Sequence, residues 1–197
     1  MESLIPPPPA VGSPTFNEQM AVVEWHQQTR TPAQVEFVET TLNVERFAPV
    51  LGDALFTVDG LELKQTIDDA IDEARAEYDG LKEIYDLPRP FVANENIEPI
   101  GEARPVSAYP SGHSIRAIIY ARLLAEVFPE HEEALMDLAM RVGHGRVIAG
   151  AHYPIDVTAG QTLGQAYADV IVEQPAFKEA LERIFGRQPP SRVTETP

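Results

Sequence analysis

One short segment combines three residue types that could do chemistry together. From Arg146 to Asp156 the chain reads Arg-Val-Ile-Ala-Gly-Ala-His-Tyr-Pro-Ile-Asp, so a guanidinium, an imidazole and a carboxylate fall within eleven residues. Gly150 and Pro154 interrupt the segment, and we expect the backbone to turn there. Arg146 continues one helical stripe of apolar residues and Asp156 begins another, so both charged side chains are predicted to point inward. Because buried charges are costly without partners, the sequence predicts partners for both.

Two histidines and one carboxylate have the types needed for covalent catalysis. His152 and Asp156 are about one helical turn apart, and a carboxylate that binds one ring nitrogen leaves the other free to act as a nucleophile. His113, in the segment Pro-Ser-Gly-His, could give a proton to a leaving oxygen. Alone, each histidine would more often be structural, and Asp156 could serve a helix dipole. Together they favour catalysis.

Five further residues could hold an oxyanion. Ser111 is a good N-cap, and the first turn of a helix has backbone N–H groups without helical partners. Gly112 would let an anion approach that backbone closely. Guanidinium groups can bind phosphate-like oxygens in a two-pronged way, and a lysine supplies a point charge. We therefore expect an oxyanion site that contains Lys82, Arg89, Ser111, Gly112 and Arg146. Arg104 and Arg116 flank the second motif, where a role in substrate access and a plain surface role both fit.

Composition limits the classes of function. The chain has 197 residues, 44% of them hydrophobic, which suits one soluble domain with a real core. A net charge of −16 argues against a general binder of nucleic acid or of anionic membranes. There is no cysteine, so disulfides, thiolate metal sites and cysteine nucleophiles are excluded. We expect no signal peptide at this N-terminus, which lacks a basic and then apolar pattern.

The elements that must position these residues are predicted to be helices. Apolar residues recur at helical spacing, and no alternating run is long enough for a sheet. The acidic residues between 68 and 79 are interpreted as a solvated helix face, not as a metal site. We expect an all-α, single-domain helical bundle over 15–186, with helices at 15–30, 32–44, 62–87, 111–128, 130–149, 155–173 and 175–186.

Three segments outside these helices have their own predictions. The span 88–110 holds five prolines and joins two motifs, so we interpret it as a Pro-rich active-site loop. Residues 1–14 are predicted to form an extended Pro-rich arm, and 187–197 a loose tail. The helix at 111–128 is apolar nearly all round and is therefore placed at the centre of the bundle.

Taken in chain order, the motifs resemble a known family. Lys-x6-Arg-Pro, Pro-Ser-Gly-His and Arg-x5-His-x3-Asp resemble the tripartite signature of the type 2 phosphatidic acid phosphatase superfamily, and within it the soluble bacterial class A non-specific acid phosphatases. The resemblance implies that His152 forms a phosphohistidine, Asp156 orients it and His113 is the general acid. It also implies phosphate binding by Lys82, Arg89, Ser111, Gly112 and Arg146.

One position departs from the family pattern. The family usually has a serine before the third-motif arginine, where this chain has Gly145. The missing hydroxyl removes one contact to phosphate or to its supporting residues. The neighbouring His144 is a candidate to compensate for this loss.

Our hypothesis is a metal-independent acid phosphatase of broad specificity that needs no cofactor. Its substrates would be small phosphate monoesters such as nucleotides, sugar phosphates and aryl phosphates, with no nucleic-acid or membrane partner. Because His113 must be protonated to act as an acid, we expect an acidic pH optimum, and vanadate should inhibit as a transition-state mimic. The resemblance implies a periplasmic or secreted location. The sequence leaves the oligomeric state open.

Two other functions fit the same residues. A vanadium-dependent haloperoxidase would use the oxyanion site for a vanadate cofactor, although the short chain favours the phosphatase. A non-enzymatic helical module could bind phosphate without hydrolysing an ester. The complete set of acid, nucleophile and orienting carboxylate disfavours that module.

Overall fold

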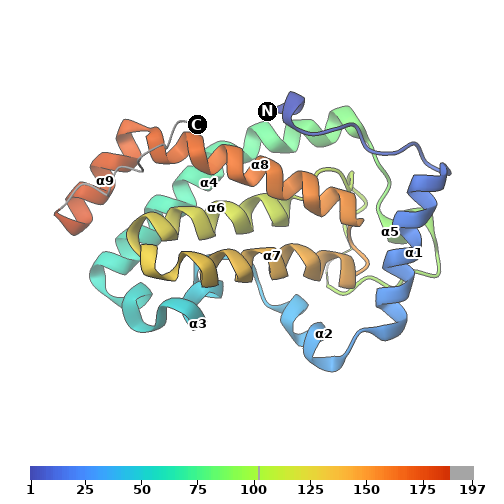
Figure 1. The fold of residues 1–197 in the computed structure, drawn as a ribbon, viewed down its shortest axis with the longest axis horizontal. Coiled ribbons are helices and arrows are strands. Elements are labelled where there is room, and N and C mark those ends of the chain that lie inside the picture. Colours follow the sequence, from blue (N-terminus) through green and yellow to red (C-terminus); the bar gives the residue numbers. More distant parts are fainter. Residues whose placement is uncertain (102, 187–197) are drawn as a thin grey trace, which may run out of the picture.

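The helix α6 (Gly112–Val127) lies between α7 (Glu132–Ile148) and α8 (Pro154–Glu173), and its closest packing is with these two helices (Figure 1). This computed structural model describes residues 1–101 and 103–186, among which there is no strand. Most side chains of α6 are buried, as its all-round apolar pattern predicts. The prediction of an all-α bundle around a central apolar helix is therefore confirmed.

Two glycines let α8 approach α6 closely. A Cβ atom added at Gly160 would lie 2.5 Å from the carbonyl oxygen of Ser111, and one added at Gly164 would lie 2.7 Å from that of Ile115. The backbone N–H of Ser111 also donates to the carbonyl oxygen of Asp156 at 3.0 Å. The first turn of α8 is thus held directly against the beginning of α6.

The long helix α4 (Val58–Tyr85) packs its apolar face on this core. Thr57 begins it as an N-cap, because its hydroxyl accepts the backbone N–H of Gly60 at 3.0 Å. The helix ends where Asp86 adopts a left-handed conformation with φ 36°. The predicted helix at 62–87 was thus correct in kind and placed too late in the chain at both ends. Its buried residues are Gly60, Leu63, Ile67, Ile71, Tyr78 and Leu81.

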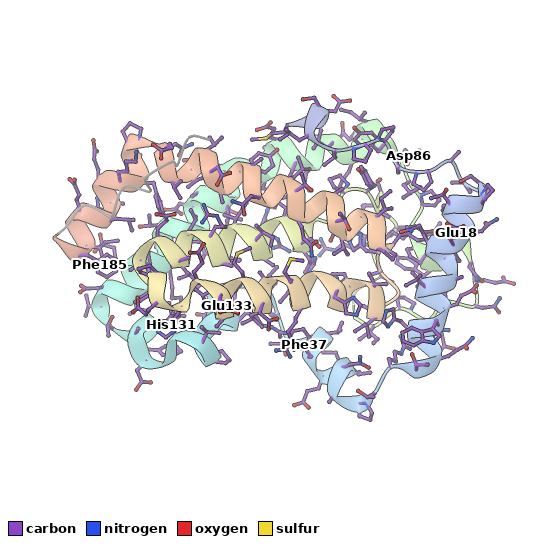
Figure 2. The ribbon with its side chains drawn as sticks, viewed as in Figure 1. Glu18, Phe37, Asp86, His131, Glu133 and Phe185 are labelled. Carbon is purple, nitrogen blue, oxygen red and sulfur yellow. The ribbon has the colours of Figure 1, made fainter. Side chains whose placement is uncertain are left out.

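The N-terminal helices cover one end of the bundle. α1 (Pro14–Thr29) is followed by α2 (Pro32–Glu39), which begins with a capping box made by Thr31 and Gln34. The prediction that this second helix runs to Val44 was wrong, because the chain leaves the helix at Thr40 and buries Leu42 and Val44 in the core. Figure 2 shows Phe37 at the side of α2 that faces α7.

The remaining elements are short or terminal. They are α3 (Ala48–Leu51), α5 (Pro90–Ala93), α9 (Pro175–Phe185) and the 3-10 turns Glu2–Leu4, Val44–Phe47, Gly52–Phe56 and Pro129–His131. Apart from α5, the described part of the 88–110 span forms no helix, in agreement with the predicted loop. The N-terminal arm runs from the end of α4 toward α1, and the hydroxyl of Tyr109 donates to the carbonyl oxygen of Pro6 (Figure 1). The predicted tail at 187–197 lies outside the described residues.

None of the helices described is both long enough and apolar enough to cross a bilayer. Within the same residues, no group of three or more acidic, histidine or cysteine side chains is placed to hold a metal ion.

Candidate active site

The predicted nucleophile stands just before α8. His152 is 1% exposed and Asp156 is fully buried. Nδ1 of His152 lies 3.2 Å from Oδ2 of Asp156, and the same oxygen accepts the backbone N–H of Tyr153 at 2.8 Å. Gly150 makes the turn before them at φ +68°, and a Cβ atom there would meet the side chain of Ile97 at 2.8 Å. Only glycine fits both the conformation and the space at this position.

Arg89 determines which nitrogen of His152 carries the proton. Its Nη1 lies 3.2 Å from Nε2 of His152 and also donates to the carbonyl oxygen of Ala151 at 3.1 Å. A guanidinium has no acceptor, so Nε2 must accept with its lone pair. Nδ1 then carries the hydrogen and donates it to Asp156. The hydrogen-bond pattern therefore leaves an unprotonated nucleophilic nitrogen beside a cation.

The other two motif cations reach the same space from α4 and α7. Nζ of Lys82 donates to the carbonyl oxygen of Pro110 at 2.9 Å, which ties the end of α4 to the beginning of α6. Nε of Arg146 is buried and has no hydrogen-bond partner among the residues that the structure describes. A buried guanidinium nitrogen without a partner is costly unless a ligand supplies the acceptor.

The beginning of α6 carries the second motif. The hydroxyl of Ser111 accepts the backbone N–H of Ser114 at 3.3 Å, which is the predicted N-cap. Ser111 is fully buried and does not line the cavity, whereas Gly112 and His113 do. The structure thus shows Ser111 supporting the helix, and its contact with phosphate stays a prediction.

These side chains surround a cavity of about 530 Å³ that opens between α2, α4, α6 and α7. The volume lies within the range of about 300–1,000 Å³ that is typical of small-molecule sites. Lys82, Arg89, Gly112, His113, Arg146 and His152 all line it, whereas Asp156 lies behind His152. The three motifs, which span more than seventy residues of sequence, therefore converge on one cavity.

Burial, helped by the surrounding cations, lowers the pKa of both histidines. Burial, followed by the charge of Arg146, lowers the pKa of His113 to about 2. Burial and the charge of Arg89 lower the pKa of His152 well below its usual value. A bound phosphate would bring negative charge and raise the pKa of His113 again. If His113 is the general acid that the sequence predicts, it should gain its proton together with the substrate.

The pKa values of Lys82 and Asp156 are also shifted. Burial lowers the pKa of Lys82 to about 8, with a further contribution from Arg89. Burial raises the pKa of Asp156 to about 7, against the hydrogen bond from Tyr153 and the charges of Lys82 and Arg89. A phosphate bound here would place its negative charge beside a cluster of cations and so neutralise their positive charge.

The structure shows what surrounds Gly145, the position at which the family usually has a serine. A Cβ atom there would lie 3.3 Å from the side chain of Val38 and 3.7 Å from that of Phe37, so α2 packs against the glycine. The expectation that His144 compensates for the missing hydroxyl was wrong. His144 is exposed, does not line the cavity, and its ring packs edge-on to His26 with centroids 4.9 Å apart.

Sequence reasoning missed several lining residues. Arg46 and Arg75 both face the cavity, and Arg104 and Arg116, for which two roles had been open, line it as well. For Arg75 a signal existed, because it precedes Lys82 by seven residues and so shares a helical face with it. Arg46 gave no comparable signal, since it lies in a 3-10 turn far from the motifs.

Comparison with known families agrees with this geometry. The model of the PAP2 superfamily matches residues 73–180. The chain belongs to the PAP2 superfamily. The matched residues include all three motifs of this PAP2 chain and the helices α6, α7 and α8 that position them.

Two curated relatives that align with most of this PAP2 chain carry the same description. A non-specific acid phosphatase of Providencia stuartii is 26% identical over 192 residues, which cover 92% of this chain and 77% of the relative. A non-specific acid phosphatase of Salmonella typhimurium is 29% identical over 194 residues, covering 91% and 76%.

Two solved structures share the PAP2 fold. A transmembrane PAP2-type phosphatidylglycerolphosphate phosphatase of Bacillus subtilis has a TM-score of 0.56 at 20% identity, covering 82% of this chain and 86% of its own. A bacterial vanadium-dependent iodoperoxidase has a TM-score of 0.65 at 17% identity, covering 84% and 50%. At these identities the similarity concerns the fold alone.

Proposed function

We propose that this PAP2 protein is an acid phosphatase that hydrolyses small phosphate monoesters through a phosphohistidine at His152. One observation carries the proposal: His152 lines a cation-lined cavity with its Nε2 3.2 Å from Arg89, while Asp156 holds the opposite nitrogen at 3.2 Å. The two relatives named non-specific acid phosphatase, each of which aligns with over nine-tenths of this chain, support the same reaction class.

In the first step, Nε2 of His152 attacks phosphorus, and the bond between phosphorus and the ester oxygen breaks. His113 gives its proton to the leaving oxygen, so the alcohol departs neutral. The imidazole becomes positively charged as the nitrogen–phosphorus bond forms, and the buried carboxylate of Asp156 stabilises that charge. In the second step, His113 removes a proton from water, which attacks phosphorus and breaks the bond to His152.

The remaining residues of the site stabilise the phosphoryl group in transfer. Charge spreads over three equatorial oxygens in such a transition state, so catalysis depends mainly on positioning and electrostatics. Lys82, Arg89 and Arg146 would supply the cations, with the unpartnered Nε of Arg146 as one donor. Backbone N–H groups at the beginning of α6, beside Gly112, would supply neutral donors.

The first experiment measures hydrolysis of p-nitrophenyl phosphate in the presence of a chelator. We expect turnover by the unaltered protein, loss of turnover in His152→Ala, and retention in His131→Ala. His131 is a matched control because it lies fifteen residues before Arg146, about 22 Å away along α7. Turnover that disappears with the chelator and returns with a divalent cation would overturn metal independence.

A second experiment traps the intermediate. Rapid quenching after addition of phosphate-labelled substrate should give a phosphoprotein that survives base and decays in acid, because a nitrogen–phosphorus bond is acid-labile. His152→Ala should give no such species. A label that survives acid would indicate an oxygen ester and would remove His152 as the nucleophile.

Further measurements separate the competing functions. Vanadate should inhibit p-nitrophenyl phosphate hydrolysis, since it mimics the trigonal-bipyramidal transition state. Halide oxidation with vanadate and peroxide, without phosphatase turnover, would indicate a haloperoxidase. Tight phosphate binding with neither reaction would indicate a non-enzymatic module. A panel of nucleotides, sugar phosphates and aryl phosphates tests the breadth of specificity.

We further propose that the protein works in the periplasm or outside the cell. The support is the resemblance of its three motifs to those of the bacterial class A acid phosphatases. Fractionation of the native host, with immunodetection of the protein in the periplasmic and culture fractions, tests the location. Recovery in the cytoplasmic fraction alone would overturn it.

A further inference from the structure

The cavity holds more positive charge than one phosphate group requires. Among the described residues, seven cationic side chains line it, out of 15 lysines and arginines in the whole chain. Two carboxylates, Glu39 and Asp79, also line it and offset only part of that charge. A phosphate monoester carries at most about two negative charges. In a chain with a net charge of −16, so local a concentration of cations indicates a substrate with more than one anionic group.

Arg75 and Arg116 stand apart from the three motif cations. Arg75 precedes Lys82 by seven residues on the same face of α4, which places the two about 10 Å apart along the helix. Arg116 lies one turn beyond Gly112 on α6, and its Nε donates to the carbonyl oxygen of that glycine at 3.4 Å. Both arginines therefore sit one to two helical turns from the residues that would hold the reacting phosphate.

The buried side chain of Tyr78 brings these two arginines together. Its ring is 2% exposed and lies 3.6 Å from where a Cβ atom of Gly112 would stand. Burial raises the pKa of the Tyr78 hydroxyl, and the neighbouring Arg75 and Arg116 act in the opposite direction. The three groups thus form one polar cluster where α4 faces α6.

Arg46 and Arg75 differ in how firmly their present contacts hold them. Arg46 donates to the carbonyl oxygen of Phe37 and stacks over its ring at 4.2 Å, so it holds α2 in place. The ion pair of Arg75 with Asp72, at 3.3 Å, joins two well-exposed side chains and is therefore weak. Arg75 can exchange that pair for a bound anion at little cost.

The size of the cavity leads to the same conclusion. A water molecule takes up about 30 Å³ in the liquid, and a phosphate group has five heavy atoms. One phosphate group therefore occupies only a small part of the 530 Å³. There is room for a sugar-sized body and a second phosphate.

We propose that Arg75, Arg116 and the hydroxyl of Tyr78 form a second anion subsite, which selects phosphate monoesters that carry another phosphate group. Sugar bisphosphates are the chemical class that fits. The inference rests on the proposed function, because it assumes that the reacting phosphate binds beside His152. The test uses fructose 1,6-bisphosphate and fructose 6-phosphate, which differ only in the second phosphate.

The kinetic experiment compares kcat/KM for the two substrates at low ionic strength. We expect the unaltered protein to prefer the bisphosphate at least tenfold. Arg75→Gln and Arg116→Gln should each lower that ratio about three- to tenfold, and the double variant should bring it close to one. Arg183→Gln is the matched control, because it removes one charge from α9, where Arg183 forms an exposed ion pair with Glu62 of α4, and it should leave the ratio unchanged. A ratio near one in the unaltered protein would overturn the subsite, as would a ratio that neither variant changes.

A binding experiment separates this inference from the proposed function. His152→Ala is titrated with both sugar phosphates by calorimetry, with and without Arg75→Gln and Arg116→Gln. Tighter binding of the bisphosphate that depends on both arginines supports the subsite even if the unaltered protein hydrolyses nothing. Hydrolysis of p-nitrophenyl phosphate combined with equal binding of both sugars would keep the phosphatase and remove the subsite.

Discussion

Asp156 holds His152 with the same oxygen, Oδ2, that accepts the backbone N–H of Tyr153, while its buried Oδ1 has no hydrogen-bond partner within the described part of the chain. In Asp156→Asn the single amide oxygen can take over both hydrogen bonds, so the tautomer of His152 is preserved and only the charge is lost. We expect kcat for p-nitrophenyl phosphate to fall about a hundredfold, because the positive charge on the phosphohistidine loses its counter-charge.

The matched comparison is Asp156→Ala, which loses the charge and the orienting bond and should cost at least tenfold more. Circular dichroism and thermal unfolding verify that both variants fold. Equal kcat in Asp156→Asn and the unaltered protein would show that the carboxylate orients His152 without any electrostatic role.

His113 is predicted to protonate the leaving oxygen, so its removal should matter most for poor leaving groups. General acid catalysis contributes about 10²–10⁴-fold. We expect His113→Ala to lower kcat by this amount for fructose 6-phosphate and by much less for p-nitrophenyl phosphate, whose leaving group departs without a proton. Steady-state rates with both substrates check this. Equal losses for the two esters would assign His113 to binding, not to proton transfer.

We expect Lys82 to make phosphate binding depend on pH. Burial and the neighbouring Arg89 lower its pKa to about 8, so the side chain is charged below that pH and neutral above it. The proposed contact with phosphate requires the charged form, and affinity should therefore fall as pH rises through 8. Calorimetric titration with inorganic phosphate between pH 7.5 and 9.5 measures this fall.

The variant Lys82→Met supplies the control for that profile. Losing a charge-assisted hydrogen bond costs about 1.5–3 kcal/mol, so binding should weaken roughly 10- to 150-fold at pH 7.5. The remaining affinity should be nearly independent of pH over the same range. A decline above pH 8 that persists in Lys82→Met would place the titrating group elsewhere.

Much of the site could be predicted because its signals are local. The N-cap at Ser111, the turn at Gly150 and the one-turn spacing of His152 and Asp156 depend on a few neighbouring residues. Helical periodicity likewise predicted α4 and α6, although the bounds of α4 shifted because capping by Thr57 and the left-handed Asp86 give weak sequence signals.

The parts that could not be predicted depend on contacts between distant segments. Arg46 reaches the cavity only because α2 ends at Glu39 and the next turn folds back over Phe37. The side chain of His144 turns toward His26 on α1, a contact that no spacing within α7 indicates. The surroundings of Gly145 also depend on a distant segment, because the space left by the missing hydroxyl borders α2.

Close packing of α8 on α6 holds the two halves of the site together, and glycine substitutions test it. A methyl group at Gly160 would lie 2.5 Å from the backbone oxygen of Ser111, so Gly160→Ala must push the helices apart. Overpacking of this kind costs about 1–3 kcal/mol, or a fall in Tm of about 2–4 °C per kcal/mol. Gly80→Ala on α4 is the control, since nothing lies within 4 Å and helix propensity should stabilise it by up to about 1 kcal/mol. Calorimetric scans of both variants, with kcat measured below Tm, check the prediction. An unchanged Tm in Gly160→Ala would mean that α8 does not press on the beginning of α6, and the catalytic residues would then need another means of alignment.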